Sequence, residues 1–382
     1  MVGHFFSPAQ DLLVLLTRAS PGTREDHNVE VTFKSLSEDK VHPDAASAVV
    51  VLEPQVDWNY DHMHAMISGD YYGLFSRHCY TDGVKVDILQ IWNWKLKDWC
   101  RVKHLDPKDM AMVFCFLSND RLLVVTLAGL MLYSLVNSAN TIQLTAKFSL
   151  PALSSRSGSI TSIYSVCNQD EASPFTSSLY SSRFQARNQL IILQMATSGD
   201  KYYSQSFRCY IEQNAFLELE STYANLYGNA SEDTPRLPWS SWGPKCTRFM
   251  KGSGYNHCFY GLRTAELIGS APSSASERDQ LRKLCIRDFN PHQVMHYKAG
   301  NRTKWRERLV EGELPGLQSH FLEPIGGLPY LEITTREKFH VRDIDMDESR
   351  VILSNVYEGD TDVITGIQVL DFSQFWSTGS IL

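Results

Sequence analysis

His62 and His64, preceded by Asp57 and Asp61, are the residues whose spacing best fits a metal site. Residues two apart on a β-strand point to the same side, so the two imidazoles can share one ion. No third ligand of matching spacing follows them in the sequence. Two solvent-facing histidines on a strand explain the pattern better. We therefore predict neither a metal site nor another cofactor.

Two carboxylate pairs, Asp343 with Asp345 and Asp360 with Asp362, have the residue types that act as acid and base on a glycosidic bond. Both pairs fall where strands meet turns, and Asp favours such positions because its side chain bonds to nearby backbone. The sequence has no Gly-x-Ser-x-Gly elbow, Walker loop or Gly-x-Gly-x-x-Gly motif. We predict no catalytic residues.

Four aromatic residues are candidates for binding a partner: Trp58, Tyr60, Trp239 and Trp242. Tryptophan is enriched at binding hot spots, so an exposed Trp239 and Trp242 can anchor another protein. Buried under a Pro-bounded loop, the same pair seals a sheet, and we favour burial. Trp58 and Tyr60 precede a predicted strand, where a binding loop and core packing are both open.

The elements that must position these residues are built around one stretch, Asn119 to Leu135, which has the sequence NDRLLVVTLAGLMLYSL. Two apolar runs are separated by Ala128 and Gly129, which predicts a β-hairpin because Gly accepts the backbone conformation of a tight turn. The runs are continuous rather than alternating. Both faces of the hairpin are therefore expected to be covered by other sheets.

The second strand of this hairpin recurs along the chain. LMLYSL (130–135) aligns with VTFKSL (31–36), LQIWNW (89–94), LCIRDF (284–289) and IQVLDF (367–372). Positions one and three are aliphatic or Phe, position five is Asn, Asp or Ser, and position six is aromatic or Leu. A sixth candidate, around Phe207 to Ile211, fits poorly. Each copy follows a predicted turn, at Asp11, Asp70, Asp120, Asn188 and Ser349 among others.

The repeat predicts an all-β fold, a divergent WD-like β-propeller of six or seven blades. Trp92-Asn93, Tyr133-Ser134 and Leu370-Asp371 stand where the Trp-Asp dipeptide of WD repeats would be. We expect a single closed domain over 1–382, with long serine-rich surface loops near 151–182 and 269–279. Helices are expected to be absent, except for a turn or two at Glu277 to Leu284.

Composition and charge limit the binding partners and the cellular compartment that we expect for this chain. The 382 residues carry a net charge of -7, which argues against a nucleic-acid partner. The most hydrophobic window, Leu122 to Val136, is too short to span a bilayer, so we expect no membrane partner. No signal peptide is recognisable, and the eight cysteines are scattered, as expected for free thiols. The predicted location is intracellular, either cytoplasmic or nuclear.

Several phrases resemble basidiomycete F-box proteins: FSPAQDLLVLL (6–16), LQIWNW (89–94), LPWSSWGPKCTRF (237–249) and RVILSNVYEGDTDVITGIQVLDF (350–372). The resemblance runs over most of the chain and implies the substrate-recognition propeller of a ubiquitin-ligase receptor. The helical F-box itself is not recognisable, because the first predicted strand begins within the first dozen residues. Contact with the ligase adaptor is therefore expected only if an F-box is supplied upstream.

The sequence thus favours a non-catalytic protein-interaction scaffold whose partner or degradation substrate is unknown. The alternative is a propeller enzyme, a hydrolase of the glycosidase or lactonase kind, with carboxylates or a metal at the ring centre. Side chains of Asp, Glu or His that converge at the axial mouth would favour the enzyme. Carboxylates scattered on turns would argue against it.

Overall fold

The computed structural model describes most of the chain. The described residues are 3–18, 29–51, 58–79, 85–97, 99–135, 141–155, 157–167, 189–198, 205–228, 230–231, 233–252, 257–269, 281–300, 307–312, 316–341, 343–357 and 363–372.

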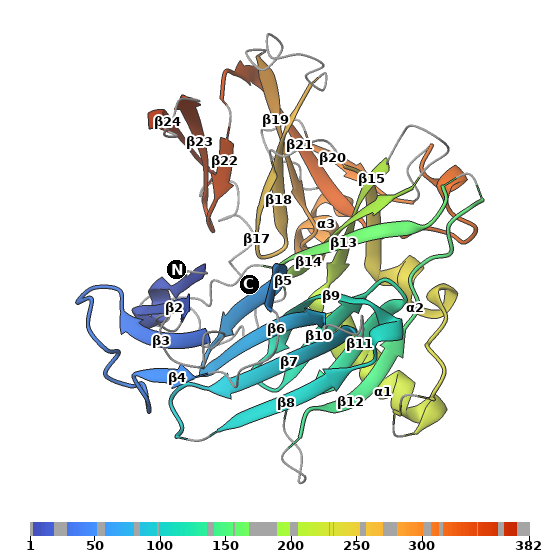
Figure 1. The fold of residues 1–382 in the computed structure, drawn as a ribbon. Coiled ribbons are helices and arrows are strands. Elements are labelled where there is room, and N and C mark those ends of the chain that lie inside the picture. Colours follow the sequence, from blue (N-terminus) through green and yellow to red (C-terminus); the bar gives the residue numbers. More distant parts are fainter. Residues whose placement is uncertain are drawn as a thin grey trace. The chain divides into compact units, whose positions relative to one another are not determined.

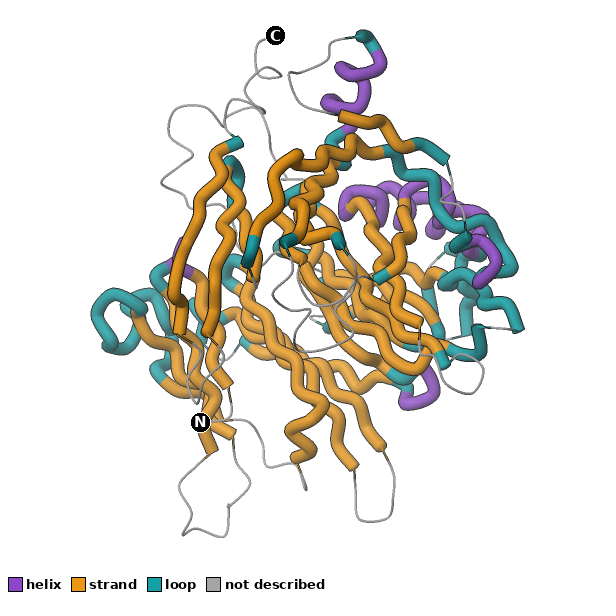
Figure 2. The backbone as a smooth tube through the Cα atoms, turned by 90° about the horizontal axis from the view of Figure 1, so that it is seen from above, coloured by secondary structure: helices purple, strands orange, loops and turns teal. Residues whose placement is uncertain are grey.

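The predicted all-β class is confirmed, because the described chain forms six sheets of three to five strands (Figure 1). We number these sheets one to six in chain order. In five of them the strands lie in the order in which they occur in the chain, and in sheet 5 strand β21 lies between β19 and β20. Strands far outnumber helices (Figure 2).

The first three sheets have four strands each. Sheet 1 contains β1 (Gly3–Ser7), β2 (Leu12–Arg18), β3 (Val29–Ser35) and β4 (Val49–Val51). Sheet 2 contains β5 (Trp58–Ser68), β6 (Tyr71–Cys79), β7 (Lys85–Asn93) and β8 (Cys100–Leu105). Sheet 3 contains β9 (Ala111–Ser118), β10 (Arg121–Thr126), β11 (Gly129–Ser134) and β12 (Gln143–Phe148).

The last three sheets differ in strand number. Sheet 4 contains β13 (Ile160–Cys167), β14 (Leu190–Thr197), β15 (Gln205–Glu212) and β16 (Thr247–Lys251). Sheet 5 contains β17 (His257–Tyr260), β18 (Arg263–Ile268), β19 (Arg282–Asp288), β20 (Glu307–Val310) and β21 (Tyr330–Phe339). Sheet 6 contains β22 (Asp343–Met346), β23 (Arg350–Tyr357) and β24 (Val363–Asp371).

Three α-helices lie between the strands: α1 (Gln213–Tyr227), α2 (Trp239–Cys246) and α3 (Pro291–Lys298). The expectation that helices are absent is therefore wrong. α1 escapes sequence analysis because it buries only Phe216 and Tyr223, which give a narrow apolar stripe. The segment Glu277 to Leu284 is predicted as a helical turn. Of its described residues, Arg282 to Leu284 instead form the start of strand β19. No described helix is long and apolar enough to cross a membrane.

Contacts divide the chain into two compact units. The first comprises residues 1–150, 161–187 and 216–238, and the second comprises 151–160, 188–215 and 239–382. A single closed domain stays a prediction.

In the first unit, sheet 2 packs between sheets 1 and 3. Leu12 and Val14 of β2 and Phe33 of β3 share one apolar cluster with Ile67 of β5 and Leu74 of β6. Side chains alternate across a strand, so the next residues point to the opposite face. There His64 of β5 meets Phe114 of β9, with ring centroids 5.2 Å apart.

The hairpin predicted at Asn119 to Leu135 is confirmed as β10 and β11, which pair from Arg121 with Ser134 to Thr126 with Gly129. Nearly every side chain in both strands is buried, as continuous apolar runs predict. Gly129 begins β11 with a φ of +147°. A Cβ at this position would stand 2.2 Å from the carbonyl oxygen of Phe148, so only glycine fits here.

One backbone hydrogen bond recurs in all six sheets, and we call it the closing hydrogen bond. The amide of the residue directly after the third strand donates to the carbonyl of the residue directly before the second strand. The pairs are Leu36 to Asp11 (2.8 Å), Trp94 to Asp70 (3.1 Å), Leu135 to Asp120 (2.9 Å), Gln213 to Gln189 (2.8 Å), Phe289 to Leu262 (2.9 Å) and Phe372 to Ser349 (2.7 Å).

The five sequence copies of the repeat are therefore structurally equivalent, since their position-six residues are five of these six donors. The sixth copy is Arg208 to Gln213, one residue later than the candidate in the sequence. It fits poorly because position one is Arg208 rather than an aliphatic residue, and position six is Gln213, where α1 begins.

In sheets 1 and 3 the polar side chain at position five bonds to the same turn or to the residue directly after it. The Ser35 hydroxyl donates to Asp11 Oδ2 at 2.5 Å, and the Ser134 hydroxyl accepts from Arg121 Nη1 at 3.1 Å. Hydrogen bonds, that of Ser35 foremost, hold the pKa of the Asp11 carboxyl below its usual value. Each copy thus fixes the end of its third strand to the turn between its first two strands.

In the second unit, both faces of sheet 5 pack against neighbouring sheets. Ala265, Ile286 and Ile333 lie on one face in an apolar cluster with Leu353 and Val351 of sheet 6. The other face meets sheet 4 through a smaller cluster, which includes Ile192, Tyr210, Met250, Phe289 and Tyr330.

The serine-rich stretch at 154–162 is predicted as a surface loop, but part of it is buried. Ser157 is buried, and its hydroxyl lies 3.1 Å from His320 Nδ1. The amide of Ser154 donates to the His320 carbonyl at 2.9 Å. From Ile160 the chain continues as β13. The remaining serine-rich residues, 173–182 and 270–279, lie outside the described part of the chain.

Replacing Gly73 of β6 with alanine tests the packing between sheets 2 and 3. A Cβ there would stand 2.6 Å from the Phe114 ring and 3.0 Å from Ile91 Cδ1. We expect the G73A substitution to lower the free energy of unfolding by about 1–3 kcal/mol through overpacking. Gly3 of β1 is the matched control, because its nearest contact would be an ordinary 3.5 Å. Equal urea midpoints for G73A and G3A would contradict this packing.

Candidate functional site

Ionisable side chains gather most densely where sheets 4 and 5 meet in the second unit. Arg208 comes from β15, Glu266 from β18, Arg287 from β19 and Glu332 from β21. Cross-strand register places Arg287 opposite Glu332. Glu266 alternates with Ala265 and Leu267 of the apolar face, so it points toward sheet 4. We call these four residues the charge cluster.

The four side chains of the charge cluster form a chain of ion pairs. Arg208 Nη1 donates to Glu266 Oε2 at 2.9 Å, and Arg287 Nη2 donates to Glu266 Oε1 at 2.5 Å. Arg287 Nε lies 3.5 Å from Glu332 Oε2. Arg308 on β20 completes the chain by donating from Nη2 to Glu332 Oε1 at 2.6 Å. Arg208 is 1% exposed, so this chain runs from the buried interface to the surface.

A third buried arginine, Arg248 of β16, lies in the same interface and is held by backbone. Its Nε donates to the Leu328 carbonyl at 3.0 Å, its Nη2 donates to the Val310 carbonyl at 3.2 Å, and its Nη1 donates to the Gly312 carbonyl. The guanidinium also stands 5.1 Å from the centroid of the Tyr330 ring. Burial lowers the pKa of Arg248 below its usual value.

The ion pairs of the charge cluster join sheet 4 to sheet 5, and we call this arrangement the inter-sheet lock. Its central carboxylate, Glu266, is not free to act in catalysis. Both oxygens of Glu266 accept from guanidinium groups, so neither is available to take a substrate proton. A buried carboxylate between two arginines is stable only while all partners stay in place. The cluster therefore fixes how sheet 4 and sheet 5 pack within this unit.

Sequence analysis missed the charge cluster because its members come from four strands between residues 208 and 332. One signal was present. Arg208 occupies position one of the repeat, where the other copies have Val31, Leu89, Leu130, Leu284 and Ile367. In four of these copies, all except Ile367, position one is buried, so a charged residue there indicates a buried partner.

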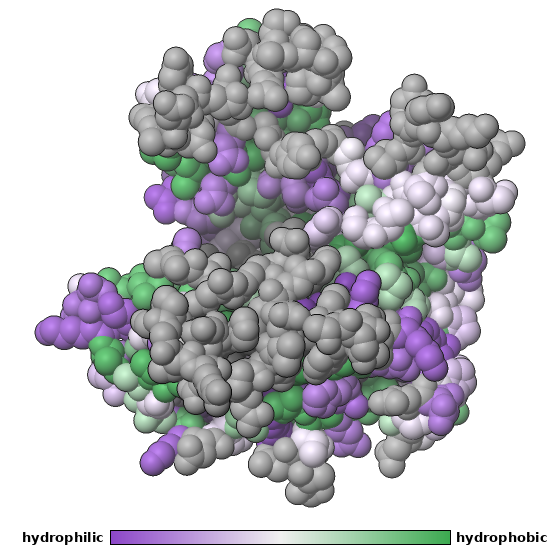
Figure 3. Space-filling model, in the orientation of Figure 1, coloured by the Kyte–Doolittle hydropathy of each residue, from purple (hydrophilic) through white to green (hydrophobic). Residues whose placement is uncertain are grey.

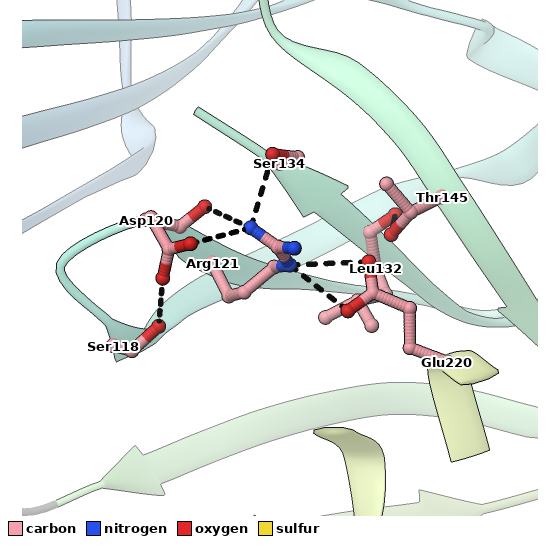
Figure 4. Close-up of polar contacts among 7 residues, drawn as sticks. All are labelled: Ser118, Asp120, Arg121, Leu132, Ser134, Thr145 and Glu220. Atoms are coloured by element: carbon pink, nitrogen blue, oxygen red, sulfur yellow. Dashed lines mark hydrogen bonds and ion pairs between the residues drawn. The ribbon is translucent and has the colours of Figure 1, made fainter. Parts of the chain in front are cut away.

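A second polar cluster lies in the first unit at the turn between β9 and β10, which precedes the predicted hairpin (Figure 4). Arg121 donates through Nη1 to Asp120 Oδ2 at 2.7 Å and through Nε to Glu220 Oε2 at 2.9 Å. Glu220 belongs to α1, whose Phe216 packs edge-on against Phe148 of β12 at 5.5 Å. These contacts attach α1 to sheet 3.

Trp239 and Trp242 are each 1% exposed, so the burial that we favoured for this pair is confirmed. Their rings meet edge to face at 4.8 Å on α2, and Trp239 Nε1 donates to the Pro324 carbonyl at 2.8 Å. Trp239 also packs against Phe249 of β16. Partner binding by these two residues stays a prediction, and their closed packing does not support it.

Trp58 and Tyr60, the other predicted partner-binding residues, lie at the start of β5 rather than in a loop before it. The backbone of Trp58 pairs with that of His78. Their side chains are outside the described part of the structure, so their role stays a prediction.

Among the residues weighed for metal binding and acid–base catalysis, those whose side chains are described form no metal-binding group. The described residues contain no group of three or more His, Cys, Asp or Glu that could hold a metal ion. His64 is packed against Phe114, and the side chain of His62 lies outside the described set. Asp343 and Asp345 lie within β22 rather than at a turn, and each accepts from the amide directly after it, at 2.9 and 2.8 Å. Asp360 and Asp362 are not among the described residues.

No protein-family model matches the chain, and a search of curated proteins finds no match. Among solved structures, the crystal structure of the WD40 domain of SCAP from fission yeast is similar to it. The match has 10% sequence identity and a TM-score of 0.33, and it covers 85% of this chain and 73% of that chain. A TM-score this low does not establish a shared fold, so the architecture rests on the sheets themselves.

Replacing Glu266 with glutamine tests the charge cluster. The substitution leaves two buried guanidinium groups without their shared carboxylate, so we expect the free energy of unfolding to fall by about 3–5 kcal/mol. E311Q is the matched control, because Glu311 pairs with Lys298 at 2.5 Å while both are about half exposed. That change is expected to cost about 0–1 kcal/mol. Equal losses in denaturant titrations of the two variants would contradict the lock.

Acid titration of stability tests the burial of His64. Desolvation lowers the pKa of His64 to about 4, from 6.5. Between these values the unfolded chain binds the proton and the folded chain does not. Stability from this site is therefore complete above about pH 6.5 and falls as the pH drops to about 4. We expect H64F to flatten this limb of the stability curve, while H104F, at an exposed position on β8, leaves it unchanged. An unaltered limb in H64F would contradict the assignment.

Proposed function

We propose that this chain is a non-catalytic protein-interaction scaffold, built as a WD-like β-propeller in which each sheet is one blade. The observation that carries the proposal is the position of the first strands. In the first unit β1 contacts β5 and β5 contacts β9, and in the second unit β17 contacts β22. Blades of a propeller pack face to face and bring one strand of each toward a common axis.

Blade number and ring closure are part of this proposal. Six sheets carry the closing hydrogen bond, which supports a ring of six blades within the predicted range of six or seven. A rigid ring of this kind presents its connecting loops to partners, as loops on a fixed frame generally do.

The use of the carboxylates supports a non-catalytic role. Glu266 and Glu332 are paired with arginines, Asp120 is paired with Arg121, and Asp343 accepts from the Ile344 amide. These are structural tasks. The alternative of a propeller hydrolase gains no supporting observation from them.

The finer proposal is that the propeller recognises substrates for an F-box type of ubiquitin ligase. It is supported by the resemblance of four phrases to basidiomycete F-box proteins, of which LPWSSWGPKCTRF (237–249) forms α2 and the start of β16. That phrase contains two tryptophans because both are buried, and Trp239 packs against Phe249 of sheet 4.

Affinity purification of the tagged chain from fungal cells tests both levels of this function. We expect a stoichiometric protein partner with the normal chain and its loss with the lock-deficient variant E266Q. Cullin-ligase subunits are expected in the same eluate if the ligase role holds. A partner without cullin subunits would remove the ligase role and keep the scaffold. A well-folded normal chain that recovers no partner would contradict the scaffold.

A further inference from the structure

Sheet 6 differs from the other five sheets in the described structure because it ends at its third strand. In sheets 1 to 5 the third strand has a further strand along its outer edge: β4 beside β3, β8 beside β7, β12 beside β11, β16 beside β15 and β21 beside β19. In sheet 6 the third strand is β24, and the described sheet contains no strand beyond it. Among the described residues, no strand pairs with its outer backbone edge, and an unpaired edge can accept another strand.

The side chains of β24 are also uncovered. Ile367 is 60% exposed and Val369 is 53% exposed, whereas the third strands β7 and β11 are almost wholly buried. Phe372 lies in the apolar cluster with sheet 5, and Leu370 packs against it. Because residues two apart share a face, Ile367 and Val369 point away from that cluster.

Part of the edge of β24 lacks the usual protection against strand pairing. Natural edge strands carry charges or proline, or are bulged, to prevent other chains from adding to them. Residues 363–370, VITGIQVL, contain no charge and no proline. The register shift between Asn355 and Val356 of β23 bulges β24 at Thr365, and the strand ends at the exposed Asp371. Between these two features Ile367 to Leu370 pair regularly with β23 and carry no charge. A regular, uncharged stretch of this kind is a template for β-strand addition.

The segment that contains sheet 6 is acidic. Residues 341–372 contain two arginines and eight Asp or Glu, a net charge of -6. Asp343 and Asp345 are exposed, and the register places them in the same rows as Ile367 and Val369. In Figure 3 the visible surface over sheet 6 accordingly shows hydrophobic and hydrophilic side chains next to one another. The complementary strand is aliphatic at alternate positions and basic at its ends.

The size of the edge fits a peptide better than a second copy of the chain. A strand of this length spans roughly 30 Å, and one added strand covers roughly 300 Å² of it. A stable interface between two proteins buries about 800 Å² on each partner. Peptide recognition by strand addition needs no such area, because main-chain hydrogen bonds supply the affinity.

We propose that β24 is the docking edge for an extended segment of a partner protein, with aliphatic residues at alternate positions and Lys or Arg at its ends. The segment adds as the fourth strand of sheet 6 and places its aliphatic side chains beside Ile367 and Val369. This inference rests on the scaffold function and specifies the partner that one blade binds.

The probe is the labelled peptide Lys-Arg-Val-Thr-Val-Thr-Val-Arg-Lys, titrated into the full chain by fluorescence anisotropy. We expect saturable binding, together with slower hydrogen exchange of the amides in β24. The double variant I367K/V369K is expected to weaken binding by at least about tenfold. Its matched control is V49K/V51K, which adds the same charges at the same spacing to the exposed valines of edge strand β4. The control is expected to bind as the normal chain does.

A peptide that is N-methylated at alternate residues keeps the side chains and charges but loses the main-chain donors, so we expect it not to bind. Equal binding by this peptide, or by I367K/V369K with a normal melting temperature, would overturn the proposal. Amides of β24 that point away from β23 and already exchange slowly in the free protein would show the edge filled by the chain itself. A concentration-dependent dimer abolished by I367K/V369K would assign the edge to a second copy. Either result would contradict the docking of a partner peptide at β24. Recovery of a cellular partner by affinity purification would still support the scaffold function.

Discussion

The closing hydrogen bond is the constraint on which the rest of this structure depends. It joins the end of the third strand to the turn before the second strand, so it fixes both the length and the register of each meander. A buried amide at a strand end costs free energy unless it finds an acceptor. The turn carbonyl supplies that acceptor six times, while the donor side chains of Trp94, Leu135 and Phe289 are buried. Each sheet is thereby a separate, pre-formed layer.

The interfaces between these layers are not equivalent. Sheets 1 and 2 meet through aliphatic and aromatic side chains, and so do sheets 5 and 6. Sheets 4 and 5 instead enclose the charge cluster and Arg248 beside a small apolar cluster. Apolar layers tolerate sliding, whereas ion pairs with fixed geometry do not, so the polar interface specifies one arrangement. Sheet 6 differs again, because the apolar side chains of Ile367 and Val369 on β24 face solvent.

The all-β class, the repeat and its turns could be predicted from the sequence because they are local. Asp11, Asp70, Asp120 and Ser349 were identified as turn residues, and each provides the carbonyl of a closing hydrogen bond. The sixth copy could not be placed, because Arg208 breaks the apolar pattern and its compensating Glu266 lies 58 residues away. Helix α1 was missed for a related reason, since Arg121 of sheet 3 and Glu220 of the helix meet only in the folded chain. Burial of Trp239 and Trp242 was favoured from the sequence, but the proline-bounded loop expected there is helix α2, and a site that binds a partner has no local pattern.

Residue-resolved hydrogen exchange on the folded chain tests the central claim most directly. The amides of Leu36, Trp94, Leu135, Gln213, Phe289 and Phe372 are the six donors of the closing hydrogen bond. If each sheet is closed in this way, all six exchange slowly, including Leu36, whose side chain is exposed, and Gln213, which sequence analysis did not place. Fast exchange at several of these amides in an otherwise folded protein would contradict the account.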